Sequence, residues 1–414
     1  IAPGVGDFSI NMDRNMIAYS GDMGMTVLDL ETMDELPIDL SMEQLHVDIP
    51  SEWSHMFEEA WRRQRDFFWA PNMGGVDWDA VGAKYRAVLP QIGSREELND
   101  LIGEMYGELQ ASHAYIGGGD PADWADYIDV GLLGIDGHAE RDGFRIDRIL
   151  PAQGWTSDAA SPLDAAWQDV SEGDLIVAIN GQPVSAHSNI YEHLQGQAGK
   201  TVRLSLRDQN QGHDQMSESR VIEVEALADE MTLRYLDWVE HNRQIVTEAT
   251  GGQVGYLHIP DMDGLGLTMF SRYYYPQIKK NALIIDIRNN GGGFVSQMII
   301  ERLAREVLGY DSIRHGIDMT YPWCTFEGPM VALIDQHAGS DGDIFPAMFR
   351  RKQLGPLIGT RTWGGVIGIS EGVPFLDGGY HTQTEAAWWE AEGGWTLENR
   401  GVEPDIEVAF TPSD

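Results

Sequence analysis

The sequence predicts a multidomain protein of mixed α+β class, and changes of pattern along its 414 residues carry that prediction. An opening stretch alternates polar and apolar side chains as strands do, and from about residue 40 the apolar period becomes helical. Short strands then return, and the C-terminal part alternates strands with helices, as an α/β layer does. We therefore expect an all-β piece, a helical domain, a β domain and an α/β domain at residues 1–38, 39–125, 126–229 and 230–414.

The first two regions contain specific local signals. The segment MIAYSGDMGMTVLDLET is typical of a strand, a tight turn and a second strand. Because two or three strands cannot bury a core alone, residues 1–38 should be the end of a larger all-β domain. In the helical region, Ser94 and Glu97 form the pattern of a capping box ahead of apolar residues three and four apart. The stretch ASHA follows this helix, which places Ser112 and His113 in a loop.

The region 126–229 carries two glycine-containing motifs, VGLLGIDG and VSEGDLIVAINGQPV. Together they resemble the signatures of PDZ domains. The resemblance implies that Gly131, Leu132, Leu133 and Gly134 form a loop whose backbone N–H groups bind the terminal carboxylate of a peptide added as an extra strand. A small β domain used only for packing is the alternative.

Two loops of small residues follow buried strands in the region 230–414. One comes after NALIID and contains residues 291–293, all glycine; the other comes after PMVALI and reads HAGSDGDIFP, with Ser340 ahead of a helix. The carboxyl ends of neighbouring parallel strands meet at one edge of a sheet, so we expect these loops to lie close together. Glycine lets a backbone N–H approach a ligand unobstructed, which suits an oxyanion hole, whereas NNGGGF lacks the Lys-Ser/Thr of a phosphate-binding loop.

Ser340 has two interpretations. Ser-x-x-Asp is a common helix N-cap pattern, and the same position suits a nucleophile because the N–H groups of a helix end stabilise negative charge. A serine nucleophile needs a base. His337 is near but ends a strand and should point elsewhere, and Lys352 should lie on the third turn of the following helix, facing away. A Ser–Lys dyad is therefore poorly supported, and the base should come from another segment.

The order of motifs resembles the tricorn protease family over nearly the whole chain. A helical segment ending in SHAY, the PDZ-like segment, RNNGGG, AGSDGDIFP, GTRTWGGVIGI and ENRGVEPD follow one another as in the C-terminal half of those enzymes. The family is related to the tail-specific proteases and to ClpP/crotonase-like folds. The resemblance implies that residues 230–414 form a ClpP/crotonase-like α/β catalytic domain and that residues 1–38 are the terminal strands of a β-propeller.

The same resemblance implies a serine peptidase with assigned residues. Ser340 matches the family's nucleophile, His113 its general base and Glu398 the acid that fixes the imidazole tautomer. Ser112 is expected to hydrogen-bond Glu398, which makes a four-residue relay. The family's oxyanion donors match the backbone N–H groups of the glycine loop and of the residue after the nucleophile: Gly292 or Gly293, and Asp341.

Specificity and assembly are further implications of the resemblance. Asp311 matches by position an Asp that reaches in from a symmetry-related subunit and favours basic residues at the cleavage position. The family forms large symmetric rings, so we expect a homo-oligomer such as a hexamer. It would act in the cytoplasm on peptides released by a larger protease. The resemblance implies no cofactor and no metal.

Composition excludes several other classes. The 28 basic and 66 acidic residues give a net charge of −38, which repels nucleic acid and anionic membranes. Cys324 is the single cysteine, so neither an intrachain disulfide nor a Cys-based zinc cluster is possible. No apolar run approaches the roughly 18–20 residues that span a membrane. Three alternatives stay open: a tail-specific-type endopeptidase with a different base, a PDZ-bearing peptide-binding scaffold with an inactive α/β domain, and a crotonase-like acyl-CoA enzyme.

Overall fold

The computed structural model describes residues 7–21, 24–39, 46–120, 128–156, 159–164, 168–187, 189–208 and 219–409, in two compact units, 1–59 and 60–414. In the first unit an antiparallel sheet contains β1 (Asp7–Ile10), β2 (Met16–Gly21), β3 (Gly24–Asp29) and β4 (Glu35–Ile38) in that order. The predicted strand pair is present as β2 and β3, and its Asp22–Met23 turn lies outside the described residues. Because β1 and β4 are exposed along their whole length, this sheet has no core of its own.

The helical region contains α1 (Ile49–Phe67), α2 (Trp78–Arg86) and α3 (Arg95–Gly107), with short 3₁₀ turns at Met73–Gly75 and Leu89–Gln91. The capping box at the start of α3 is confirmed, since the N–H of Glu97 donates to Ser94 Oγ at 3.2 Å. The Glu97 carboxylate in turn accepts the N–H of Gly93 at 2.6 Å. The apolar face of α3 is buried, as its periodicity predicts.

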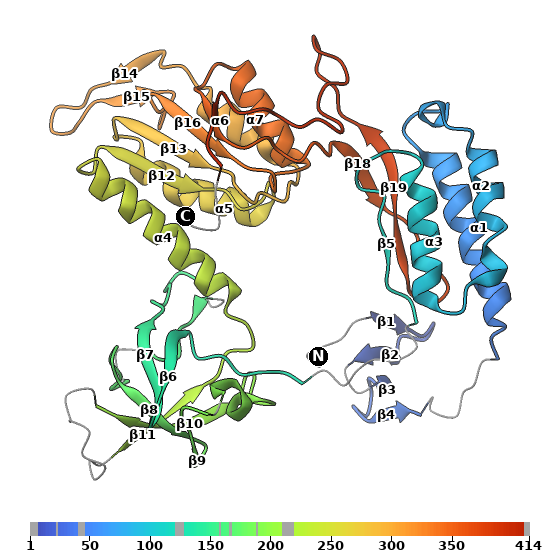
Figure 1. The fold of residues 1–414 in the computed structure, drawn as a ribbon, viewed down its shortest axis with the longest axis horizontal. Coiled ribbons are helices and arrows are strands. Elements are labelled where there is room, and N and C mark those ends of the chain that lie inside the picture. Colours follow the sequence, from blue (N-terminus) through green and yellow to red (C-terminus); the bar gives the residue numbers. More distant parts are fainter. Residues whose placement is uncertain are drawn as a thin grey trace. The chain divides into compact units, whose positions relative to one another are not determined.

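The loop after α3 is attached to a sheet made mostly by C-terminal residues. Strand β5 (Ile116–Gly117) pairs with β19 (Tyr380–Ala387), which also pairs with β18 (Ile367–Glu371). Figure 1 shows this three-stranded sheet with α3 beside β5. Residues Ser112 and His113 are therefore held close to residues far along the chain.

The region 131–229 forms a six-stranded antiparallel sheet with its own apolar core, in which Ile146, Ile176 and Leu204 are fully buried. The sheet order is β11-β10-β8-β7-β6, with β9 paired to β8. The elements are β6 (Ile135–Glu140), β7 (Gly143–Ile149), β8 (Leu175–Ile179), β9 (Gln182–Pro183), a 3₁₀ turn at Ile190–Leu194, β10 (Thr201–Arg207) and β11 (Arg220–Glu225).

The C-terminal region is the expected α/β layer, and its five-stranded sheet is parallel in the order β12-β13-β16-β17-β20. Helix α4 packs on β12, and α6 packs on α7 (Figure 1). The elements are α4 (Met231–Ala249), β12 (Val254–His258), α5 (Gly264–Tyr274), a 3₁₀ turn at Tyr275–Gln277, β13 (Ala282–Asp286), α6 (Ser296–Leu303), the hairpin β14 (Gly309–Asp311) and β15 (Met319–Tyr321), β16 (Met330–Ile334), α7 (Asp341–Arg351), β17 (Leu357–Gly359) and β20 (Ile406–Glu407). Because β13 and β16 are neighbours, the two predicted loops lie at one edge of the sheet.

In the part of the chain that the structure describes, no helix combines the length and the apolar character needed to cross a membrane.

Candidate active site

The glycine loop packs directly against the loop that carries Ser340. The N–H of Gly339 donates to the carbonyl of Asn290 at 3.0 Å. A Cβ placed on Gly292 would lie 2.4 Å from Ser340 Cβ, and the φ of Gly292 is +88°. Only glycine fits at this point, which explains the run of small residues after β13.

Ser340 adopts a backbone conformation that is rare for a residue with a side chain. Its φ of 58° and ψ of −124° place it in a strained region, as a residue on a sharp strand-to-helix turn often is. It occupies the N-cap position of α7, but its hydroxyl makes no capping hydrogen bond. The side chain instead borders a cavity of about 790 Å³. Ser340 thus occupies the cap position without capping the helix, and its hydroxyl forms no hydrogen bond with any described residue.

Ser112 lies between His113 and Glu398 and contacts both. Its Oγ is 3.0 Å from His113 Nδ1 and donates to Glu398 Oε2 at 3.1 Å. The N–H of Ser112 donates to Glu398 Oε1 at 2.7 Å, across 286 residues of sequence. Because the Ser112 hydroxyl donates its hydrogen bond to Glu398, the Ser112 oxygen accepts a hydrogen bond from the Nδ1–H of His113. A neutral His113 then has an unprotonated Nε2, which is the tautomer that a general base requires.

His113 borders the same cavity as Ser340, although no hydrogen bond joins the two described side chains. Its ring lies 5.1 Å from that of Trp363 and 5.8 Å from that of Tyr115, measured between centroids. Burial lowers the pKa of His113 below its usual value of 6.5, and the charge of Glu398 partly opposes that change. A base and a nucleophile that share a cavity commonly come within hydrogen-bond distance only when substrate binds.

Two backbone N–H groups beside Ser340 are available to a ligand. The N–H of Gly292 donates to Asn290 Oδ1 at 2.9 Å and is therefore committed. The N–H groups of Gly293 and Asp341 have no partner among the described residues. Of the two glycines named from the sequence, Gly293 is the one whose donor is available for an oxyanion.

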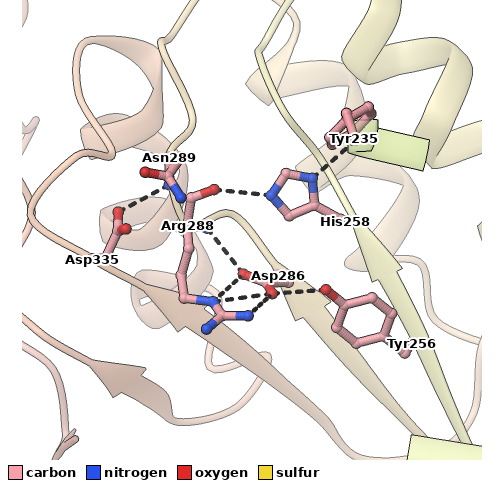
Figure 2. Close-up of polar contacts among 7 residues, drawn as sticks. All are labelled: Tyr235, Tyr256, His258, Asp286, Arg288, Asn289 and Asp335. Atoms are coloured by element: carbon pink, nitrogen blue, oxygen red, sulfur yellow. Dashed lines mark hydrogen bonds and ion pairs between the residues drawn. The ribbon is translucent and has the colours of Figure 1, made fainter. Parts of the chain in front are cut away.

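A carboxylate that the sequence reasoning missed joins the two loops. Asp335 Oδ1 accepts the N–H of Asn289 at 3.0 Å in the glycine loop. It also accepts the N–H groups of His337 at 3.1 Å and Ala338 at 3.0 Å in the Ser340 loop. Figure 2 shows Asp335 facing Asn289. An acidic residue directly after a buried strand was the available signal.

A second group of polar side chains supports the start of the glycine loop (Figure 2). His258 lies between the hydroxyl of Tyr235, 3.0 Å from Nδ1, and the carbonyl of Arg288, 2.9 Å from Nε2. The Arg288 guanidinium pairs with Asp286, whose carboxylate also accepts the Tyr256 hydroxyl at 2.8 Å. Burial lowers the pKa of His258, consistent with a neutral ring whose Nε2–H donates to the carbonyl. This group fixes the backbone just ahead of residues 291–293.

The cavity walls are mainly apolar and come from α6, α7 and β18. Among the lining residues are Phe294, Ile300, Ile344, Met348, Val366 and Trp388. Lys352, expected to face away, also borders the cavity from the C-terminal end of α7. Lys352 follows Ser340 by twelve positions, about 18 Å at 1.5 Å per residue of helix, so Lys352 borders the cavity at a distance from Ser340. His337 does point elsewhere, with Nε2 at 3.1 Å from the amide nitrogen of Gln336.

Asp311 lies apart from these residues. It ends β14 on the β14–β15 hairpin and is exposed, and it is not among the residues that line the cavity of its own chain.

Three of the four backbone N–H groups of the PDZ-like loop at residues 131–134 donate to other parts of the chain. The N–H groups of Gly131 and Leu132 donate to the carbonyls of Leu194 and Leu227 at 2.8 and 2.9 Å. The N–H of Gly134 donates to the Glu230 carboxylate at 3.1 Å. The adjoining cavity, lined in part by Leu133, measures only about 10 Å³. A carboxylate is therefore bound where one was expected, but it belongs to the chain itself.

Among the described residues, no group of three or more His, Cys, Asp or Glu side chains is arranged to hold a metal ion.

Three family models match consecutive parts of the chain. The tricorn protease C1 domain matches residues 49–107, the tricorn protease PDZ domain residues 131–229, and peptidase family S41 residues 253–408.

Curated relatives cover nearly all of the chain. The chain is 40% identical over 391 residues to tricorn protease homolog 1 of Streptomyces coelicolor, covering 93% of this chain and 36% of the relative. It is 37% identical over 410 residues to the tricorn protease of Thermoplasma acidophilum, covering 99% of this chain and 38% of the relative. The crystal structure of the tricorn protease superposes with a TM-score of 0.88 at 35% identity, over 99% of this chain and 40% of that one. The chain thus spans less than half the length of these relatives.

Proposed function

Because the chain belongs to the tricorn protease family of serine peptidases, we propose that it hydrolyses peptide bonds of oligopeptides through an acyl-enzyme on Ser340. The observation that carries the proposal is the contact of Ser112 with both His113 and Glu398, at the border of the cavity that Ser340 also lines.

In the acylation step the Ser340 oxygen attacks the carbonyl carbon of the scissile bond, and its proton passes to His113 Nε2. The N–H groups of Gly293 and Asp341 donate to the resulting oxyanion. The carbon–nitrogen bond then breaks, and the departing amine takes the proton from His113.

In the deacylation step a water molecule attacks the ester and gives a proton to His113. The bond between the carbonyl carbon and the Ser340 oxygen breaks, and His113 returns the proton to Ser340. The products are a peptide with a new amino terminus and a peptide with a new carboxylate.

In this mechanism Glu398 acts on His113 through Ser112. When His113 becomes an imidazolium, its Nδ1–H donates to the Ser112 oxygen, and the Ser112 hydroxyl continues to donate to the Glu398 carboxylate. The negative charge of Glu398 stabilises the imidazolium, and the fixed geometry keeps Nε2 available to Ser340.

Substrate choice and assembly belong to the same proposal. A cavity of about 790 Å³ with mainly apolar walls suits side chains and backbone of a short peptide. Asp311, exposed on the β14–β15 hairpin, is proposed to enter the site of a neighbouring copy in a ring such as a hexamer, where it would favour basic residues. Residues 1–38 are proposed to be the last strands of a β-propeller, supported by the antiparallel order of β1 to β4 and the exposure of β1 and β4. We also propose a cytoplasmic role downstream of a larger protease.

Labelling with a fluorophosphonate, which reacts with activated serines, tests the mechanism. We expect one adduct, mapped to Ser340 by peptide mass spectrometry, and its loss in His113→Ala. His337→Ala is the matched control, because His337 is nearer in sequence but faces Gln336, and its labelling should be unchanged. An adduct on another residue, or undiminished labelling in His113→Ala, would refute the proposal.

A further inference from the structure

Asp343 is a buried carboxylate in the first turn of α7, three residues after Ser340, and it is the acid of the Ser-x-x-Asp pattern. Its side chain is fully buried and forms no ion pair with any described residue. Its backbone N–H donates to the carbonyl of Ser340 at 2.9 Å, which ties it to the strained turn. A buried carboxylate without a cation is costly unless several donors satisfy it.

Three of those donors come from one short segment, residues 362–365, and the backbone of Ser340 also lowers the pKa of the Asp343 carboxyl. Asp343 Oδ1 accepts the Thr362 hydroxyl at 2.5 Å and the N–H of Gly364 at 2.8 Å. Its Oδ2 accepts the N–H of Gly365 at 3.0 Å. Burial raises the pKa of Asp343, and these hydrogen bonds oppose that rise.

The same segment continues directly to the Ser112–Glu398 contact. The next residue, Val366, donates its N–H to Glu398 Oε2 at 2.8 Å, and Ile367 donates its N–H to Ser112 Oγ at 3.3 Å. Trp363, within the segment, packs its ring against His113. Residues 362–367 are therefore held by Asp343 at one end and by Glu398 and Ser112 at the other.

We propose that Asp343 is a positioning residue that sets the distance between Ser340 and the His113–Ser112–Glu398 relay by fixing residues 362–365 to the helix of the nucleophile. The inference rests on the proposed function, because it concerns the alignment of the same base and nucleophile. A shift of this backbone segment would change the contact of Trp363 with the His113 ring and the hydrogen bond from Val366 to Glu398. Misalignment of about 1 Å between reacting groups costs on the order of 10²-fold in rate.

The test compares three variants with a fluorogenic oligopeptide and with fluorophosphonate labelling. Asp343→Asn replaces one acceptor oxygen by an N–H₂ group, so it should lower kcat and the labelling rate about 100-fold while KM changes less than about 3-fold. Thr362→Val removes the hydroxyl that donates to Asp343 and should lower kcat about 10-fold. Thr362→Ser keeps that hydroxyl and should restore kcat to within about 2-fold.

Asp405→Asn is the control. It also removes a carboxylate that accepts a backbone N–H in the α/β region, but away from residues 362–367. Asp405 accepts the N–H of Leu357 at 2.8 Å and contacts none of residues 362–367. It should lower the Tm and leave kcat unchanged.

The outcomes separate this inference from the proposed function. Suppose that the unaltered chain is labelled on Ser340 and that Asp343→Asn and Thr362→Val are labelled as fast as the unaltered chain. The positioning role of Asp343 is then wrong, and the proposed mechanism stands. The positioning role is also wrong if Thr362→Ser and Thr362→Val lose equal activity, since that reports packing rather than the hydroxyl. If the unaltered chain is not labelled on Ser340, the proposed function itself fails.

Discussion

Two glycine-containing loops of this chain differ in whether their backbone N–H groups already have a hydrogen-bond partner. In the PDZ-like loop at 131–134, the N–H of Gly134 is bound by Glu230 and the adjoining cavity measures about 10 Å³. In the glycine loop at 291–293, the N–H of Gly293 has no partner among the described residues, and Gly293 lines a cavity of about 790 Å³.

The contrast shows that the glycine pattern alone does not distinguish a working site from a filled one. The two loops differ in the hydrogen-bond partners of a nearby carboxylate. The Glu230 carboxylate accepts the N–H of Gly134, and the Arg234 Nε–H donates to that carboxylate at 2.6 Å. Glu398 accepts the N–H groups of Ser112 and Val366 instead, and the N–H groups of Gly293 and Asp341 have no partner among the described residues.

The largest expected effect comes from exchanging each of these two carboxylates for an amide. Glu398→Gln places an N–H₂ group against donors that need an acceptor, so the imidazolium of His113 loses its stabilising charge. We expect kcat/KM for a fluorogenic oligopeptide to fall by about 10²–10⁴-fold. Glu230→Gln, the matched change, should leave kcat/KM within about 2-fold. Equal losses in the two variants would mean that the two loops are not functionally different.

A second pair of variants adds a methyl group to one glycine of each loop. Gly293 has a φ of +142°, and a Cβ there would lie 2.1 Å from the carbonyl of Met262, so Gly293→Ala must displace the donor. The kcat should fall by about 10²–10³-fold, the cost of one oxyanion donor. Gly134 has a φ of +66° and its Cβ would lie 3.1 Å from Leu233. Gly134→Ala should cost about 1–2 kcal/mol in the free energy of unfolding without changing kcat. Loss of kcat in Gly134→Ala would contradict this distinction.

The pH dependence of the open site should also follow from burial. His113 must be neutral to act as a base, and it is neutral above its pKa, which burial lowers from 6.5. Activity should therefore persist below pH 6.5 as the pH falls. In Glu398→Gln the charge that raises the pKa of His113 is gone, so the acid limb of the kcat/KM profile should move to still lower pH. An acid limb that moves upward in this variant would show that Glu398 does not act on His113.

The smallest effect on activity is expected from removing the Glu230 carboxylate that binds the PDZ-like loop at residues 131–134. Glu230→Ala removes the internal carboxylate and should lower the free energy of unfolding by about 1–3 kcal/mol. The freed N–H of Gly134 should then bind a fluorescent peptide with a free C-terminal carboxylate but not its amidated form, measured by anisotropy. If the unaltered chain binds the free peptide equally well, Glu230 does not close the groove.

Local patterns in the sequence predicted most of the secondary structure and the adjacency of the two loops. Ser94 and Glu97 predicted the start of α3 because both partners of a cap lie within one turn. The runs NALIID and PMVALI predicted neighbouring buried strands, since a strand covered on both faces is apolar throughout. The parallel sheet then brings residues 291–293 beside Ser340 without further information.

The contacts that the sequence reasoning missed join residues over longer separations. Asp343 contacts Gly364 across 21 residues, Asp335 contacts Asn289 across 46, and Glu230 contacts Gly134 across 96. No helical or strand period relates such pairs, and each acid looks like any of the 66 in an acidic chain. Ser112, His113 and Glu398 were assigned through family resemblance, because a contact across 286 residues leaves no local pattern.

The pairing of β5 with β19 has a consequence for the chain during its own synthesis. A ribosome completes Ser112 and His113 well before Ser340, and it adds Glu398 286 residues after Ser112. Until β18 and β19 have been made and have folded back on β5, the segment that carries Glu398 cannot anchor the histidine. On the proposed mechanism, a nascent chain that contains Ser340 but not yet Glu398 has a histidine without the acid that positions it. We therefore expect the peptidase to be inactive until the segment that carries Glu398 has been made.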